Sequence, residues 1–206
     1  MYAVELHGIT KRFANTTAND SITFTVRSGE IHSLLGENGA GKTTLMKILY
    51  GMQQPDEGEI RINGVKQKID NPSVAIKLGI AMVHQHFMLI DSLTVAENVV
   101  LGYEKRKGMF FDMAGAVQAV EQLSATYGLK VDPRQKVGDL PVGTKQRVEI
   151  LKALYRQADI LILDEPTAVL TPLEVMDLFR VLRELKQAGK TIIIITQKLN
   201  ETMDLA

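Results

Sequence analysis

The stretch GENGAGKT, from Gly36 to Thr43, fits the pattern G-x-x-x-x-G-K-[ST]. It follows the short apolar run IHSLL at 31–35 and precedes TTLMKILYG, a run with helical character. A strand, a glycine-rich loop and a helix in this order predict a phosphate-binding loop, in which backbone N–H groups close around phosphate oxygens at a helix N-terminus. A glycine-rich turn could match the pattern by chance, but the flanking strand and helix favour the phosphate loop.

Two side chains of this loop have chemistry suited to a nucleoside triphosphate. Lys42 offers a positive charge to the β- and γ-phosphates, and the hydroxyl of Thr43 is a ligand for Mg²⁺. We therefore expect ATP and Mg²⁺ as cofactors. The residues predicted to bind them here are Gly36, Glu37, Asn38, Gly39, Ala40, Gly41, Lys42, Thr43 and Thr44.

Further apolar runs predict a parallel sheet. ILIL at 160–163 and TIIIIT at 191–196 are apolar without alternation, as is IHSLL, which is typical of parallel strands covered on both faces. Between ILIL and TIIIIT a helix is predicted. Thr171 is its N-cap, Glu174 closes a capping box, and Gly189 ends the helix. Strand, helix and strand in this order form a βαβ unit.

The rest of the chain divides into two parts. VELHGI, SITFTV and GEIRING predict short antiparallel strands near the N-terminus, with a hairpin turn at Asn63-Gly64. From about Phe87 to Arg156 the pattern is helical. The predicted fold class is α/β, a P-loop NTPase core with a mostly parallel sheet, an N-terminal antiparallel β subdomain and an inserted helical subdomain. The predicted regions are 1–86 and 157–206 for the core and 87–156 for the helical subdomain.

Asp164 and Glu165 end the ILIL strand, at the edge where α/β sheets place their ligands. There Asp164 is expected to hold Mg²⁺ through water, and Glu165 to act as the general base that polarises the attacking water. An acidic pair after a strand can also cap a helix. The phosphate loop elsewhere in the chain makes the catalytic interpretation the stronger one.

Composition excludes several classes of protein. Among 206 residues, Lys and Arg number 24 and Asp and Glu also number 24, so no net charge favours a nucleic-acid partner. The chain has no cysteine, which rules out disulfides and thiolate chemistry. No apolar run approaches the roughly 18 residues of a membrane helix, and no signal-peptide pattern opens the chain. We expect a cytoplasmic protein.

With the phosphate loop, the acidic pair, the helical insertion and the continuation DEPTAVLTP, the chain resembles the ATP-binding cassette (ABC) family of transport ATPases over nearly its whole length. The resemblance implies a role for Gln85, in AMVHQHFMLIDSLTVAENVVLG, as a catalytic residue and Mg²⁺ ligand that links the site to the helical subdomain. It implies that adenine stacks on Phe13, in KRF. Without the family, Gln85 would be a surface amide and Phe13 a core or strand-end aromatic.

The resemblance also gives LPVGTKQRVEI a role. Its start stands where the family carries the signature loop, usually LSGGQ, which closes over the nucleotide of an opposite cassette. The residues implied to bind that nucleotide are Leu140, Pro141, Val142, Gly143 and Thr144, with a helix from Thr144 onward directed at the γ-phosphate. Here a proline replaces the hydroxyl donor, a valine one glycine and a threonine the glutamine. As an isolated string the stretch would be only a helix start.

Two more departures from the family concern catalysis. Gln197 stands where the family has its switch histidine, and it is the third residue implied to be catalytic, beside Glu165 and Gln85. A glutamine donates one hydrogen bond but cannot carry or transfer a proton. Thr171 stands where the family has the aspartate of its D-loop. The first change affects the expected hydrolysis rate, and the second the communication between cassettes.

Within the family, the motifs look like those of importers of nucleosides or simple sugars, and the chain resembles the first of two tandem cassettes, the nucleoside branch being preferred. This implies a second nucleotide-binding domain as partner (a tandem half or a second copy), transmembrane permease subunits, and indirectly an extracytoplasmic solute-binding protein, but no nucleic acid. The expected location is the cytoplasmic face of the membrane, and the chain is expected to be truncated. Two alternatives stay open: a soluble ABC ATPase acting on nucleic acid or the ribosome, and a regulatory domain that hydrolyses ATP poorly.

Overall fold

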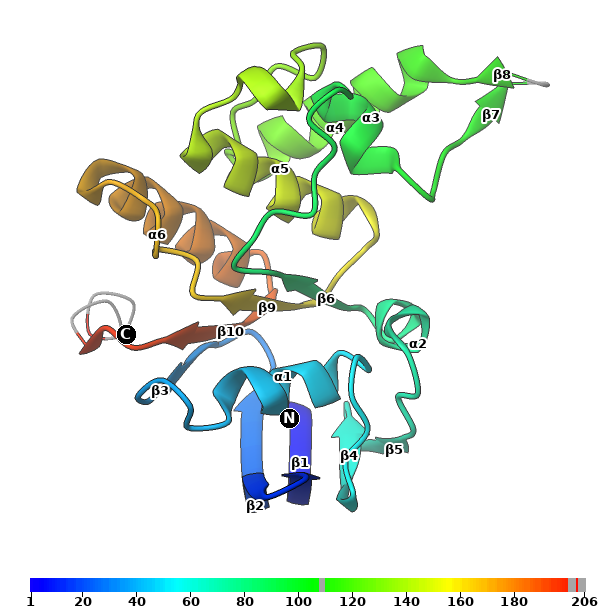
Figure 1. Cartoon of the computed structure of the whole chain (residues 1–206). Coiled ribbons are helices and arrows are strands. Elements are labelled where there is room, and N and C mark those ends of the chain that lie inside the picture. The colour runs from blue at the N-terminus through cyan, green and yellow to red at the C-terminus, as the bar shows by residue number, and fades with distance from the viewer. Residues whose placement is uncertain (108–109, 200–202, 204–206) are drawn as a thin grey trace.

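The computed structural model describes residues 1–107, 110–199 and 203 (Figure 1). Residues 108–109, 200–202 and 204–206, which belong to the predicted regions 87–156 and 157–206, lie outside the described residues. Two four-stranded sheets form the body of the molecule, and a group of helices lies against one of them (Figure 1).

The first sheet is antiparallel and is built from the N-terminal part of the chain. Its strands, in spatial order, are β2 (Thr16–Arg27), β1 (Tyr2–Phe13), β4 (Glu57–Ile62) and β5 (Val65–Gln67). Asn63 and Gly64 join β4 to β5 with φ values of 50° and 77°. A two-residue hairpin with positive φ at both positions is the turn that Asn-Gly favours, so this prediction is confirmed.

The second sheet is parallel, with strands in the order β3 (Ile31–Leu35), β10 (Thr191–Thr196), β9 (Ile160–Asp164) and β6 (Ile80–Val83). β10 and β9 are buried along their whole length, as predicted. β6, which the sequence pattern does not predict, is buried along its whole length too. For IHSLL the prediction of a fully buried strand is wrong, because β3 is only partly buried and its last residue, Leu35, is 42% exposed. Ile31 packs against one core and Leu34 against the other, but β3 pairs only with β10 among the described strands.

Each face of the parallel sheet has its own hydrophobic core. On one face, Ile160 and Ile162 pack with the helix α1 (Lys42–Leu49), which lies between the two sheets (Figure 1). On the other face, Leu161 and Leu163 pack with the helices α5 (Val142–Tyr155) and α6 (Pro172–Gln187). Successive residues of a strand point to opposite faces, which is why an uninterrupted apolar run serves both cores.

The helical part contains α3 (Val95–Val100), α4 (Met113–Thr126) and a short 3₁₀ helix (Val137–Asp139) packed around α5. It also carries a small hairpin, β7 (Arg106–Lys107) and β8 (Phe110–Phe111), which the sequence pattern does not predict. α2 (Pro72–Lys77) precedes β6. The division at 86 and 156 stays a prediction, since α5 shares its core with α6 across the second boundary. Among the described residues, no helix has the length and apolar character needed to cross a membrane.

α6 begins and ends as the sequence predicts. The Thr171 hydroxyl accepts the N–H of Glu174, and the Glu174 carboxylate accepts the N–H of Thr171, which is a complete capping box. The helix closes at Ala188, and Gly189 follows with a φ of 84°.

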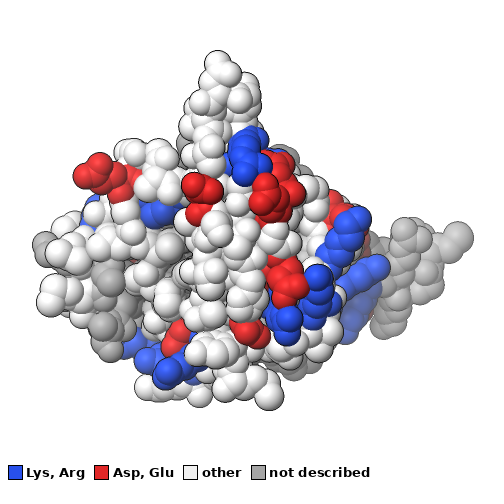
Figure 2. Space-filling view, turned by 90° about the horizontal axis from the view of Figure 1, so that it is seen from below, with Lys and Arg blue, Asp and Glu red and all other residues white. Residues whose placement is uncertain are grey.

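The surface seen from the side of the antiparallel sheet carries both signs of charge. On this face acidic and basic side chains lie next to each other rather than in separate fields (Figure 2). Ion pairs in and beside the strands of this sheet bring the two signs together, such as Lys11–Asp56 and Lys66–Glu59, each at 2.8 Å. Such a face has no extended positive field to attract a nucleic-acid backbone.

Candidate functional site

The phosphate loop lies between β3 and α1, where the sequence predicts it. Gly41 is the N-cap of α1 with a φ of 79°, and a Cβ at this position would overlap the carbonyl oxygen of Ala18. Only glycine combines this backbone with so close an approach of β2. The side chain of Asn19, buried in β2, donates to the carbonyl of Gly41 at 3.3 Å and so ties β2 to the loop.

The Lys42 ammonium lies inside this loop. Its Nζ donates to the carbonyl oxygens of Gly36 and Glu37, at 2.6 and 2.7 Å, and the side chain is buried. Within the described part of the chain, no side chain caps α1. The unpaired amides of its first turn and the Lys42 ammonium together suit an anionic ligand. The loop residues Asn38, Gly39 and Ala40 are exposed, and Thr44 lies half-buried in the first turn.

A Mg²⁺ site would be formed by Thr43 and Asp164. The Thr43 hydroxyl donates to Oδ1 of Asp164 at 3.2 Å, joining the start of α1 to the end of β9. Burial raises the pKa of Asp164 above its ordinary value, the bond from Thr43 opposes the rise, and the charge of Glu165 adds to it. A hydroxyl and one carboxylate oxygen are suitable ligands for Mg²⁺. In proteins this ion is usually bound by only one or two carboxylates, and phosphate oxygens of the substrate provide further ligands.

Glu165 follows Asp164 with strained backbone. Its φ is 47°, a left-handed value unusual for a residue with a side chain, and its N–H donates to the carbonyl of Ile195 at 3.0 Å. Both oxygens of its carboxylate accept a hydrogen bond: Nε2 of Gln85 donates at 3.2 Å and Nε2 of Gln197 at 2.6 Å. The structure thus brings all three residues predicted to be catalytic together at the ends of β6, β9 and β10.

Phe13 lies at the end of β1, 41% exposed, with Nζ of Lys11 5.6 Å from its ring centroid. The β1–β2 hairpin is tied to the phosphate loop through Asn19, so the exposed ring belongs to an element that borders the loop. Stacking of adenine on Phe13 stays a prediction.

Residues 140–144, which we call the signature stretch, do not contribute to the site formed by the phosphate loop, Asp164 and Glu165. Leu140 is buried, Pro141 is the N-cap of α5, and the helix begins at Val142, two residues before the predicted start at Thr144. α5 packs against the opposite face of the parallel sheet from α1. Among the described residues, no hydrogen bond joins 140–144 to the phosphate loop.

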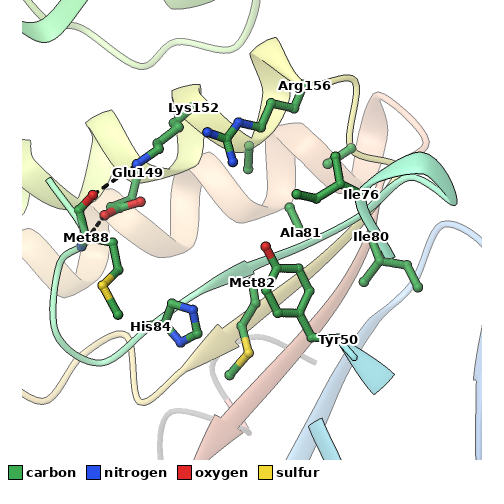
Figure 3. Close-up of a pocket in the computed structure, with 12 residues that line it drawn as sticks. Tyr50, Ile76, Ile80, Ala81, Met82, His84, Met88, Glu149, Lys152 and Arg156 are labelled. Carbon is green, nitrogen blue, oxygen red and sulfur yellow. Dashed lines mark hydrogen bonds between the residues drawn. The ribbon is translucent and has the colours of Figure 1, made fainter. Parts of the chain in front are cut away.

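A pocket of about 170 Å³ lies beside the Gln85 segment, between α5 and the end of β6 (Figure 3). Glu149 Oε1 accepts the N–H of Met88 at 2.6 Å, and Lys152 Nζ donates to the carbonyl of Met88 at 3.0 Å. Burial lowers the pKa of Lys152 and also that of His84, which precedes Gln85. No motif in the sequence points to these α5 residues, although the spacing of Glu149, Lys152 and Arg156 places them on one helix face.

These features form a site of the kind expected for a nucleoside triphosphate. They are the phosphate loop, the Thr43–Asp164 pair and the Glu165 carboxylate with its two amide donors. The ABC transporter family profile matches residues 19–168, well over half of the chain. The chain therefore belongs to the ABC transporter family.

Relatives and a solved structure match along nearly the whole chain. The guanosine import ATP-binding protein NupO of Bacillus subtilis is 54% identical over 93% of this chain and 38% of its own length. The nucleoside import ATP-binding protein NupA of Lactococcus lactis is 52% identical over 98% of this chain and 40% of its own length. The dimeric structure of a post-hydrolysis ATP-binding cassette bound to ADP and Pi has a TM-score of 0.76 at 27% identity, covering 96% of this chain and 89% of that one. The chain thus spans about two fifths of these two curated relatives.

Proposed function

We propose that the chain is the ATP-binding and ATP-hydrolysing cassette of an importer whose solute is a nucleoside or, as the second choice, a simple sugar. The observation that carries the proposal is the position of the Glu165 carboxylate. It accepts hydrogen bonds from the side-chain amides of Gln85 and Gln197, and it follows Asp164, which is bonded to Thr43 at the end of the phosphate loop. The nucleoside branch is preferred because the motifs resemble it and because NupO and NupA carry nucleoside import in their names.

In this proposal the loop amides and Lys42 hold the triphosphate, and Phe13 stacks on the base. Thr43, Asp164 and Gln85 hold Mg²⁺, which supplies charge neutralisation at the phosphates. Glu165 accepts a proton from the attacking water, and Gln85 and Gln197 fix the orientation of its carboxylate. Most of the catalysis comes from positioning and charge stabilisation.

A second cassette completes the site. The signature stretch 140–144 opens α5, which packs on the opposite face of the parallel sheet from α1, so we infer that it faces the nucleotide of a partner cassette. Exposed apolar side chains occur in the stretch and in the segment that follows Glu165: Val142 in the first, and Val169 and Leu173 in the second, Leu173 next to the residue that bonds Gly143. The similar cassette that is dimeric with ADP and Pi supports this arrangement. The partner is a tandem half or a second copy, and the chain corresponds to the first of two tandem cassettes.

The remaining partners follow from the same proposal. Permease subunits bind the chain at the cytoplasmic face of the membrane, and the pocket beside Gln85 is where they contact it, since α5 and the Gln85 segment meet there. An extracytoplasmic solute-binding protein acts on the permease and so only indirectly on this chain.

Two alternatives are weaker. A cassette acting on nucleic acid or the ribosome would need a basic field, whereas the chain carries 24 basic and 24 acidic residues. A regulatory domain that hydrolyses ATP poorly is favoured by one observation, the glutamine at position 197. Single-turnover hydrolysis by the Gln197→His variant separates the regulatory domain from the proposed active ATPase. A large gain in the rate of hydrolysis supports the regulatory domain, and an unchanged rate supports an active ATPase.

The proposal is tested with Glu165→Gln in the complex of the chain with a second cassette. We expect this change to lower Mg²⁺-ATP turnover by about 10²–10⁴-fold, the usual contribution of a general base, while ATP binding persists. Binding is measured by fluorescence titration and turnover by phosphate release. Failure of the wild-type chain to bind Mg²⁺-ATP, or unchanged turnover in Glu165→Gln, overturns the proposal.

A further inference from the structure

The first turn of α5 receives its cap from a different helix. Its N-cap residue, Pro141, has no side-chain hydrogen-bonding group, and its side chain makes no capping bond. The N–H of Gly143 instead donates to Oε1 of Glu174, in the first turn of α6, at 3.2 Å. A carboxylate at a helix N-terminus satisfies an unpaired amide and interacts favourably with the helix dipole.

The same carboxylate also caps its own helix. Oε2 of Glu174 accepts the backbone N–H of Thr171 at 2.9 Å and the Thr171 hydroxyl at 2.8 Å. The two oxygens are therefore divided, one for each helix. The bonds from Thr171, with a smaller contribution from Gly143, lower the pKa of Glu174, so the group is an anion at neutral pH.

The contact between Gly143 and Glu174 is close. A Cβ at Gly143 would lie 2.6 Å from Oε1 of Glu174, so this position has no room for a side chain while the bond is present. Two further bonds join the same parts of the chain: Gln146 Nε2 to the carbonyl of Pro166 at 2.8 Å, and Arg147 to Asp177 at 3.2 Å. The start of α5 is thus fixed to the segment that follows Asp164 and Glu165.

We propose that Glu174 is a positioning residue for ATP hydrolysis, which sets the signature stretch 140–144 at the angle needed to meet the nucleotide of a partner cassette. This inference rests on the proposed function, because it assumes that the stretch completes a partner's site. Among the described residues, Glu174 has no hydrogen bond to the phosphate loop of its own chain. Its effect reaches the reaction through Gly143, and it links the start of α5 to the capped start of α6.

Glu174→Gln separates this role from the capping of α6. Glutamine at the third position of a capping box still accepts the bonds from Thr171 with its one oxygen. Its other group is then an NH₂ donor, which cannot accept the N–H of Gly143. Glu184→Gln is the matched control, because it makes the same chemical change on the same helix, at a carboxylate that pairs with Arg180 of α6 itself.

The measurements are thermal unfolding, ATP affinity of the chain, and kcat and KM in the complex in which the wild-type chain hydrolyses Mg²⁺-ATP. We expect Glu174→Gln to lower kcat about tenfold, since a charged hydrogen bond that positions the stretch is lost, with unchanged ATP affinity. The unfolding temperature should fall by only a few degrees, the cost of that one bond. Glu184→Gln should stay within about twofold of the wild type, because it removes only an exposed ion pair within α6. An unchanged or raised kcat in Glu174→Gln, or an equal loss in Glu184→Gln, overturns the inference. Absence of turnover in the wild type would overturn the proposed function instead.

Discussion

Asp164 is a carboxylate that the folded chain holds buried, and burial raises its pKa. The unfolded chain leaves it in water with its ordinary pKa. Between the two pKa values the folded state binds the extra proton, so this group makes the folded state less stable as the pH rises through that range. Above both values the cost of the buried charge is fully present.

We therefore expect Asp164→Asn to raise the urea midpoint at pH 7 relative to the wild type, and the gain to disappear near pH 3, where the carboxyl is protonated in both states. Asp70→Asn is the control, because Asp70 is exposed. Urea titrations of the chain without nucleotide or Mg²⁺ at the two pH values measure the difference. A lower midpoint for Asp164→Asn at pH 7 would show that the bond from Thr43 outweighs the cost of burial.

At the scale of single residues, the motif spacing predicts some positions and misses others. Lys42, Thr43 and Asp164 could be placed because a phosphate loop and a strand end fix where such side chains go. The paired bonds of Gln85 and Gln197 to Glu165 could not, since three strands far apart in the sequence meet there. The second bond of Glu174 was missed because its capping pattern already explains the residue locally.

At the scale of elements, two glycines of the phosphate loop have similar backbones and different surroundings. Gly39 has a φ of 84° and open space where a Cβ would be, whereas a Cβ on Gly41, at 79°, would overlap the backbone of β2. We expect Gly39→Ala to lower the free energy of unfolding by about 1–2 kcal/mol, the cost of the left-handed backbone alone. Gly41→Ala should cost on the order of 3 kcal/mol, since the loop must also move away from Ala18.

Urea denaturation of both variants tests this difference. Equal losses would mean that the loop and β2 separate at little cost, and that the bond from Asn19 does not hold them together.

Element types followed from the sequence more fully than element surroundings. The apolar runs and caps predicted β9, β10 and α6, because burial on both faces and a capping box leave local patterns. IHSLL has the same apolar pattern but lies at an edge, and strand order is not written in any one strand. α5 begins earlier than predicted because Val142 and Gly143 already take helical positions after Pro141.

At the scale of the whole molecule, α1, which follows the phosphate loop, and α5, which carries the signature stretch, pack on opposite faces of the parallel sheet. In the proposed function, a single chain therefore holds one half of each of two sites. Turnover per chain should then rise with chain concentration, or on addition of a second cassette, because each site forms only on association. A constant rate per chain over a hundredfold range of concentration would mean that one chain is sufficient.

Exposed apolar residues near the signature stretch allow a specific test of the association between two cassettes. Leu173, 71% exposed at the start of α6, lies in the turn that holds Glu174 against the signature stretch, while Val65, 59% exposed, lies on β5 of the other sheet. A glutamate at an apolar contact has to lose its hydration when the surface is covered, which opposes association. We expect Leu173→Glu to lower ATP-dependent association of the Glu165→Gln chain by at least tenfold in sedimentation velocity, and Val65→Glu to leave it unchanged. Equal effects of the two substitutions would place the partner elsewhere, because only Leu173 borders the stretch that a second nucleotide has to meet.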